Sequence, residues 1–148
     1  MKTGHADKAR ELFNEGYNCS QAVLGAFAED AGLDVKTALR LSAPFGGGMG
    51  RMREVCGGVS GMFMAIGLFF GYDEPDGAQA KKELYSYVRA LADKFKESEG
   101  SIICRELLAG VKVTTGGAPE PRTEEYYKKR PCVELVKLSV RILEELMK

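Results

Sequence analysis

The residues in this sequence best suited to chemistry are its four cysteines, Cys19, Cys56, Cys104 and Cys132. A cysteine thiolate is a nucleophile, a redox group and a metal ligand. No Cys-x-x-Cys pair occurs among them, so the sequence indicates neither a thioredoxin-type motif nor a zinc ribbon. Any site that they share must therefore be assembled by the fold.

The positions of the cysteines relative to helix starts support a chemical role. A residue typical of a helix start precedes three of the cysteines: Asn18 comes before Cys19, Ser101 three positions before Cys104, and Pro131 before Cys132. Asn and Ser are good helix caps and Pro suits the first helical position, so these three cysteines are predicted in first turns. Cys56 is also placed near a helix start, although no clear cap precedes it. Unpaired N–H groups and the helix dipole favour the thiolate there.

Burial offers a different interpretation of the same residues. Each cysteine begins an apolar stripe at helical spacing, so all four sulfur atoms are expected to point inward. Free cysteine also behaves as a small apolar core residue, and this alternative stays open. The only histidine, His5, is expected to be exposed near the N-terminus, which leaves no histidine base. Thiolate stabilisation would then depend on helix starts and on Arg51, Arg53, Arg105 and Arg130.

The hydrophobic periodicity predicts helices almost throughout and no alternating strand. The expected helices cover residues 7–15, 18–32, 34–41, 55–71 and 77–96, with a short one near 104–108 and a last one from 131. Gly46 to Gly50 form a glycine-rich loop before an apolar helix, and residues from 110 onward are expected to form a surface loop. The expected fold is an all-α, single-domain bundle of about six to seven helices, with the glycine-rich loop before a buried central helix.

The composition fits one domain over residues 1–148. Hydrophobic residues make up 45% and charged residues 28% of the chain, as in ordinary globular proteins. Twenty-one basic residues balance 21 acidic ones, which disfavours nucleic acid and anionic membranes as partners. The apolar run 55–70 falls short of the roughly 20 residues of a membrane span. Residues 1–13 lack the apolar run of a secretory signal, so a cytoplasmic, reducing location is expected.

The order and surroundings of the cysteines resemble a family of redox-active proteins named for its C_GCAxxG_C_C pattern. The resemblance is carried by residues 17–21, 54–61, Cys104 and Cys132, and it extends from about residue 16 to residue 143. It implies that the four cysteines are the redox-active positions, with Gly57 and Gly61 as candidate cofactor-binding positions. The second motif departs from the literal name: Val55 precedes Cys56, Gly57 follows it, and Gly61 comes one step late.

Related cysteine arrangements are similar to those that hold an iron–sulfur cluster in certain multi-domain cytochromes. By that resemblance Cys19, Cys56, Cys104 and Cys132 would be four thiolate ligands of a metal cluster. The sequence contains no cysteine run of ferredoxin type and no Cys-x-x-Cys-His haem motif. An iron–sulfur cluster is the first cofactor to consider, and zinc ranks below it.

Two functions are therefore carried forward. The first is a redox protein, an oxidoreductase if it is an enzyme, that uses convergent cysteines for thiol–disulfide exchange or as ligands of an iron–sulfur cluster. Its partner would be a redox protein or a small-molecule acceptor, and self-association is left open. The second is a structural zinc-binding or purely helical interaction module without redox activity.

Overall fold

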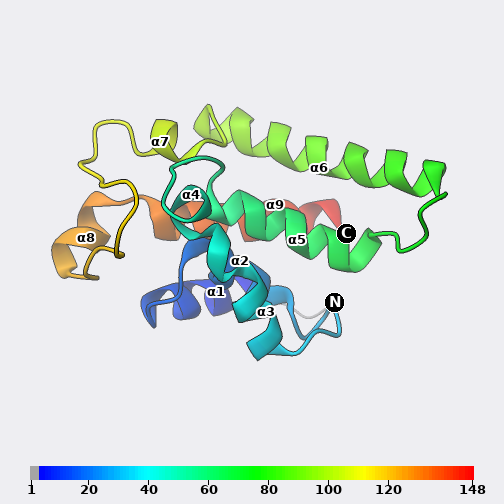
Figure 1. Ribbon diagram of the computed structural model, residues 1–148, viewed down its shortest axis with the longest axis horizontal. Coiled ribbons are helices and arrows are strands. Elements are labelled where there is room, and N and C mark those ends of the chain that lie inside the picture. The colour runs from blue at the N-terminus through cyan, green and yellow to red at the C-terminus, as the bar shows by residue number, and fades with distance from the viewer. Residues whose placement is uncertain (1–3) are drawn as a thin grey trace.

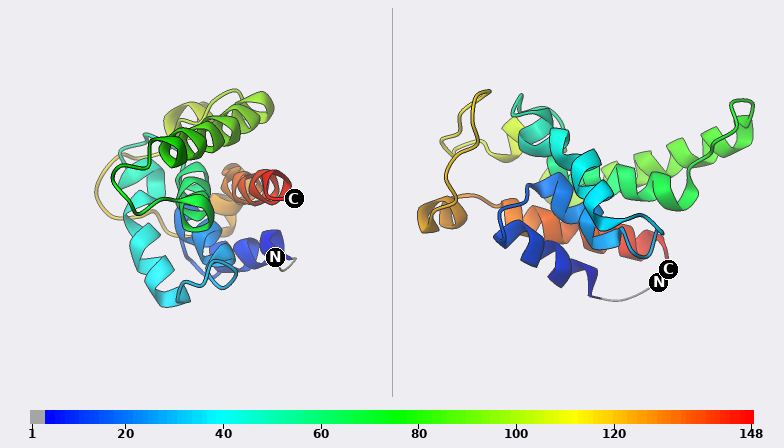
Figure 2. Two further views of the ribbon diagram at one scale, coloured as in Figure 1. Left: turned by 90° about the vertical axis from the view of Figure 1, so that its right-hand side faces the viewer. Right: turned by 60° about the horizontal axis from the view of Figure 1, so that its bottom comes forward.

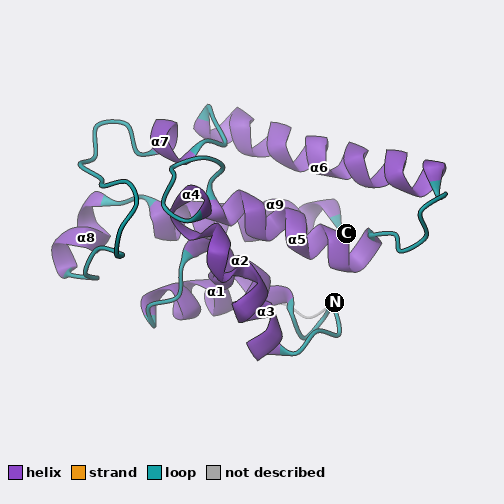
Figure 3. Ribbon diagram, in the orientation of Figure 1, coloured by secondary structure: helices purple, strands orange, loops and turns teal. Residues whose placement is uncertain are grey.

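The computed structural model describes residues 4–148, and over this range the fold is all-α, as predicted. Figure 3 shows helices joined by loops, with no strand among the described residues. The one extended pairing is an isolated antiparallel bridge between Val55 and Ile103. This bridge joins two cysteine-bearing segments.

The helices follow the predicted order with small changes at their ends. In chain order they are α1 (His5–Asn14), α2 (Cys19–Phe27), α3 (Val35–Ser42), the 3₁₀ turn η1 (Ala43–Phe45), α4 (Gly46–Met49), α5 (Gly57–Phe70), α6 (Ala78–Glu99), α7 (Cys104–Leu107), α8 (Glu124–Lys129) and α9 (Cys132–Leu146). The short α4 lies in the glycine-rich stretch that was expected to be a loop, and its Gly47 and Gly48 have a left-handed rather than a helical backbone. The short α8 interrupts the expected surface loop, because the Thr123 hydroxyl caps it by accepting from the Tyr126 N–H at 3.1 Å.

The helices pack in three tiers, with α2 and α5 in contact at the centre (Figure 1). Helices α1, α2 and α3 lie on one side, α5 and α9 in the middle, and the long α6 on the other side, as the end-on view of Figure 2 also shows. Helix α2 contacts α1, α3, α5 and α9, and seven of its nine residues are buried. The core therefore surrounds the helix that begins with Cys19.

Helix α5 is the central apolar helix that the sequence predicts, and most of it is buried. Burial is nearly continuous from Gly57 to Ile66, whereas Leu68 and Phe70 near its end are exposed. Within the described chain, no helix combines the length and the apolarity needed to cross a membrane.

Two glycines let α5 approach α2 closely. A Cβ atom at Gly61 would lie 2.8 Å from the Val23 Cβ and 2.9 Å from the Ser20 carbonyl oxygen. A Cβ at Gly57 would lie 3.1 Å from the Cys19 Cβ. Close helix packing, which the four-residue spacing suits, is thus what these glycines provide in the fold.

This contact predicts opposite outcomes for two Gly→Ala substitutions in α5. Gly61→Ala should lower the free energy of unfolding by about 1–3 kcal/mol, because the new methyl group meets backbone and a β-branched side chain. Gly67→Ala meets no atom within 4 Å and should raise it by up to about 1 kcal/mol through helix propensity. Urea denaturation of both variants measures the two changes. A stabilising Gly61→Ala would contradict the tight α2–α5 contact.

His5 is buried, and the expectation that it is exposed is wrong. Its side chain is 3% exposed and stacks on Phe27 with ring centroids 4.4 Å apart. Its Nδ1 lies 2.7 Å from the Glu144 carboxylate and its Nε2 lies 2.6 Å from the Asp30 carboxylate. His5 therefore ties the start of α1 to the end of α9 and to the segment after α2, far from the cysteines.

Candidate functional site

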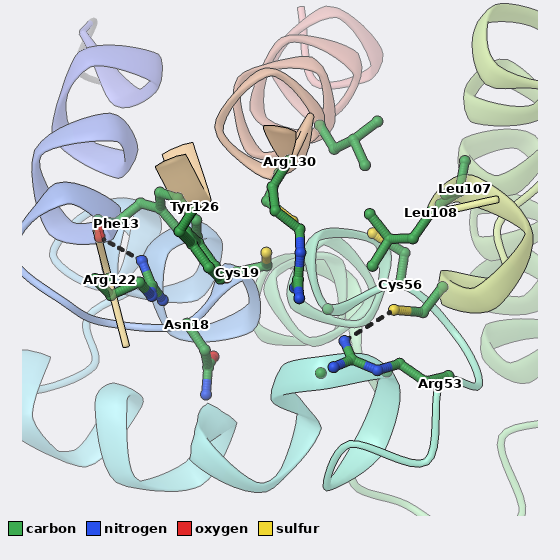
Figure 4. A pocket seen from close by; sticks show the side chains of 16 residues that line it. Phe13, Asn18, Cys19, Arg53, Cys56, Leu107, Leu108, Arg122, Tyr126 and Arg130 are labelled. Carbon is green, nitrogen blue, oxygen red and sulfur yellow. Dashed lines mark hydrogen bonds between the residues drawn. The ribbon is translucent and has the colours of Figure 1, made fainter. Parts of the chain in front are cut away.

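All four cysteines line one cavity of about 60 Å³, named the cysteine cavity below. Its wall also contains three arginines from different segments. In Figure 4 one dashed line joins Arg53 to a sulfur atom and another joins Arg122 to an oxygen at Phe13. Such a volume exceeds the roughly 10–15 Å³ needed for one water molecule. Cys56, Cys104 and Cys132 are buried and Cys19 is partly buried.

Each cysteine stands at a helix start, as the sequence predicts. Cys19, Cys104 and Cys132 are the first residues of α2, α7 and α9, and Cys56 is the N-cap residue of α5. The four helices converge at these ends, so residues separated by up to 113 positions face one space. The fold therefore assembles a shared cysteine site.

A capping box positions Cys19. The Gln21 N–H donates to the Asn18 side chain at 2.9 Å, and the Asn18 N–H donates to the Gln21 side chain at 3.0 Å. The Asn18 amide also donates to the Ala43 carbonyl at 3.0 Å, which ties this helix start to the turn before the glycine-rich stretch. Asn18 thus caps the helix as predicted, and the capping box holds the first turn that carries Cys19.

Backbone pairing positions Cys56 beside Cys104. The Cys56 N–H donates to the Ile102 carbonyl at 2.7 Å, and the Cys104 N–H donates to the Glu54 carbonyl at 2.6 Å. Ser101 does not cap α7 as predicted, because its hydroxyl accepts from the Ile103 N–H at 3.0 Å, ahead of the helix. Pairing between distant segments, rather than a local cap, places Cys104.

The glycine-rich stretch comes close to Cys104. Gly48 has a left-handed backbone with φ of 68°, and a Cβ there would lie 2.6 Å from the Cys104 Cβ. The Glu54 N–H donates to the Gly48 carbonyl at 2.8 Å, so the stretch folds back on the segment before Cys56. Glycine at position 48 removes the side chain that would occupy the place of Cys104.

Two of the four predicted arginines reach the cysteine cavity. Arg53 and Arg130 line it, and the Arg53 Nη1 donates to the Cys104 sulfur at 3.8 Å. Arg105 instead pairs with Glu54 at 2.9 Å on the surface. Arg51 bonds to the segment containing Thr114 and lines an adjoining cavity.

Arg122 and Tyr126 also line the cysteine cavity, and the sequence analysis missed both. The Arg122 guanidinium donates to the carbonyls of Phe13 at 3.1 Å and Tyr17 at 3.0 Å. It also lies over the Phe13 ring, 4.3 Å from the centroid. These contacts cross more than 100 positions, so no local pattern signals them. The one signal in the sequence is Tyr126 beside Tyr127, within the segment from residue 110 onward that was expected to form a surface loop.

Cys19 and Cys132 form a hydrogen-bonded pair with opposite pKa shifts. The bond from the Cys19 thiol lowers the pKa of Cys132 to about 7, although burial opposes this shift. The positive charges of Arg130, Arg122 and Arg53 add to the lowering. The same bond, followed by burial, raises the pKa of Cys19 well above its usual value. The pair therefore ionises first at Cys132, and the remaining proton stays on Cys19.

The other two cysteines remain thiols. Burial raises the pKa of Cys56 to about 12, although the backbone amides of Val59 and Gly58 oppose the rise. Burial also raises the pKa of Cys104, and the hydrogen bond from Arg53 offsets only part of this. A helix start thus fails to stabilise a thiolate where the loss of solvation is larger.

The cysteines share a cavity without forming a set of metal ligands. Among residues 4–148, no group of three or more His, Cys, Asp or Glu side chains is placed to hold one metal ion. Of the two candidate cofactor-binding glycines, Gly57 lines the cysteine cavity, whereas Gly61 lies one turn further along α5 against Val23.

Comparison with known proteins identifies the family of the chain. Comparisons with curated proteins and with solved structures gave no match. A family match covers residues 17–146, which contain all four cysteines and every helix from α2 to α9. The family is described as "Putative redox-active protein (C_GCAxxG_C_C)", and this chain belongs to it.

Proposed function

We propose that this protein is a thiol–disulfide redox protein in which Cys132 is the attacking thiolate and Cys19 the resolving thiol. The observation that carries the proposal is the hydrogen-bonded Cys19–Cys132 pair, which has a pKa of about 7 at Cys132. A thiol whose pKa lies near the ambient pH combines a large thiolate fraction with retained nucleophilicity.

The reaction proceeds in two exchanges with a disulfide R–S–S–R as oxidant. The Cys132 thiolate attacks one sulfur of the oxidant, its S–S bond breaks, and R–S⁻ leaves. The Cys19 thiol then gives its proton to solvent or to the departing thiolate, and its sulfur attacks the Cys132 sulfur. A Cys19–Cys132 disulfide forms and the second R–S⁻ leaves. Two protein thiols are oxidised, one disulfide becomes two thiols, and a dithiol partner reverses the reaction.

The coupling between the two cysteines favours this order of events. Before the first exchange, the hydrogen bond to Cys132 is the largest cause of the raised pKa of Cys19. When Cys132 becomes a mixed disulfide it loses its negative charge, so that bond and the accompanying charge repulsion disappear. The positive charge of Arg122 remains and still lowers the pKa of Cys19. Reaction at Cys132 thus activates the resolving cysteine.

Cysteine variants test the assignment. Reduced protein with Cys19→Ser, treated with oxidised glutathione, should accumulate a mixed disulfide at Cys132, because no thiol is paired with it to resolve the adduct. The unaltered protein should instead yield a Cys19–Cys132 disulfide. Peptide mapping by mass spectrometry under non-reducing conditions identifies both products.

Cys56→Ser is the matched control, because it removes a buried thiol from the same cavity and leaves both cysteines of the pair in place. It should still form the Cys19–Cys132 disulfide. Oxidation that links Cys56 to Cys104 and leaves Cys132 as a free thiol would overturn the assignment.

An iron–sulfur centre is the second candidate, and one observation favours it: four cysteines line one cavity. Against it, no three of the described side chains are placed as ligands of one ion. Iron and sulfide analysis with a visible spectrum of protein purified without oxygen separates the candidates. Stoichiometric iron and sulfide with charge-transfer bands would replace the exchange proposal. Zinc alone, or four unreactive thiols without metal, would favour the structural module.

A further inference from the structure

A second cavity adjoins the cysteine cavity. It measures about 300 Å³ and is named the arginine cavity below. The two cavities share six lining residues, Asn18, Gly47, Arg53, Arg122, Tyr126 and Arg130. No cysteine lines the arginine cavity itself, so a molecule bound there would reach the cysteines past these six shared residues. In Figure 4 the guanidinium groups of Arg53, Arg122 and Arg130 surround the space in front of Cys19.

The charge around these cavities is strongly unbalanced. Three arginines and no aspartate or glutamate line the cysteine cavity, and the arginine cavity adds Arg51 and one carboxylate, Glu120. Arg53 and Arg130 are 6% and 7% exposed. Guanidinium groups keep their charge in proteins, so the two cavities carry a formal excess of three positive charges. The Cys132 thiolate offsets only one of them.

The single carboxylate is already engaged. Burial would raise the pKa of Glu120, but hydrogen bonds from Thr114 and the charges of Arg130 and Arg53 hold it below its usual value. Glu120 forms an ion pair with Arg130 and lies 3.8 Å from Arg53 and 3.6 Å from Arg51. One negative charge is thus shared among three cations.

The other hydrogen bonds of these arginines go to neutral oxygen atoms. Arg51 bonds to Thr114 and to the carbonyls of Gly116 and Ala118, and the Arg53 Nε donates to the Thr114 carbonyl at 3.0 Å. Arg122 donates to two carbonyls and pairs with no carboxylate among residues 4–148. Carbonyl oxygens fix the orientation of a guanidinium without cancelling its charge. A bound anion would stabilise this partly buried excess of positive charge by pairing with the guanidinium groups.

We propose that the arginine cavity binds the carboxylate groups of a small anionic disulfide and thereby presents its sulfur to Cys132. The inference rests on the proposed function and specifies its substrate class. In the first exchange the Cys132 sulfur bonds to one substrate sulfur, the substrate S–S bond breaks, and the leaving thiolate carries its carboxylates out. A cavity of about 300 Å³ suits a small molecule, whose carboxylates Arg122 and its neighbours would bind.

Two alkylating reagents of similar size test this inference. Iodoacetate is an anion and iodoacetamide is neutral, and both react with the same thiolate, so the ratio of their rates cancels any change in the pKa of Cys132. Site-resolved mass spectrometry of reduced protein gives both rates at Cys132. We expect an iodoacetate-to-iodoacetamide ratio about tenfold higher than that of a neutral cysteine peptide, an enrichment typical of electrostatic focusing. The ratio should fall at high salt.

Arginine variants complete the test. Arg122→Gln removes a charge that lines both cavities, and Arg51→Gln removes one that lines the arginine cavity alone. Each variant should move the ratio toward that of the peptide. Arg105→Gln removes the same charge from the surface outside both cavities and should leave the ratio unchanged. A ratio equal to that of the peptide, with rapid iodoacetamide labelling of Cys132, would overturn the anion site while the exchange function stands. Failure of both reagents to label Cys132 would overturn the proposed function itself.

Discussion

Cys132 should be alkylated by iodoacetamide at pH 7 at least about 100-fold faster than Cys56 in the folded, reduced protein. With a pKa of about 7, half of Cys132 is thiolate at that pH. With a pKa of about 12, only about one Cys56 in 10⁵ is thiolate. A thiolate of higher pKa is the stronger nucleophile, so each Cys56 thiolate should react roughly 10² times faster than a Cys132 thiolate. The overall alkylation rate of Cys132 should therefore exceed that of Cys56 by about two to three orders of magnitude.

The alkylation rate of Cys132 should also depend on pH in a defined direction. Below pH 7 the Cys132 thiolate is protonated, so its alkylation rate should fall about tenfold per pH unit, and above pH 7 the rate should level off. The raised pKa values of Cys19 and Cys104 keep both slower than Cys132 near neutrality. Timed labelling between about pH 5 and pH 10, resolved by peptide, measures these profiles.

The unfolded chain is the control for this profile. In concentrated urea all four thiols should titrate together near the ordinary cysteine pKa of about 8.5, because burial and the arginine charges are lost. A Cys132 profile with its midpoint near that value in the folded protein would contradict the hydrogen-bonded pair. Equal labelling of Cys132 and Cys56 at pH 7 would contradict the burial argument.

Local features of the fold were predictable from the sequence. The Asn18–Gln21 capping box and the Asp34 cap of α3 depend on residues three positions apart, and both are present. The cysteines at helix starts follow from similar short-range signals. Helix boundaries differ where tertiary contacts intervene, as at α7, where pairing with the segment before Cys56 replaces the expected cap.

The chemistry of the site could not be predicted in the same way. Helix starts led us to expect thiolates at all four positions. Contacts with distant segments oppose this, because the hydrogen bond with Cys132 and then burial raise the pKa of Cys19, and burial raises the pKa values of Cys56 and Cys104. Arg122 reaches Phe13 across 109 positions, and no spacing rule brings these residues together. His5 was judged by its place near the N-terminus, whereas its carboxylate partners come from Asp30 and Glu144. The resemblance to a family implied that all four cysteines are redox-active positions, and the fold shows that their surroundings differ.

Gly48→Ala should be among the most damaging single substitutions near the site. The left-handed backbone at Gly48 costs a residue with a side chain about 1–2 kcal/mol. Its new methyl group would lie 2.6 Å from the Cys104 Cβ and 2.8 Å from the Arg53 Cα, and overpacking of this kind adds about 1–3 kcal/mol. We therefore expect the free energy of unfolding to fall by about 2–5 kcal/mol in urea denaturation followed by circular dichroism.

Gly100→Ala separates backbone strain from the close approach to Cys104. Gly100 ends α6 with φ of 82°, and a Cβ there meets no atom within 4 Å. Gly100→Ala should therefore lower the free energy of unfolding only by the backbone strain, about 1–2 kcal/mol. Gly48→Ala should in addition increase the alkylation of Cys104 in the folded protein, because Cys104 must move from its place beside Arg53. If both variants lose the same small amount of stability and Cys104 stays protected, the glycine-rich stretch does not position Cys104, and pairing with the segment before Cys56 does so alone.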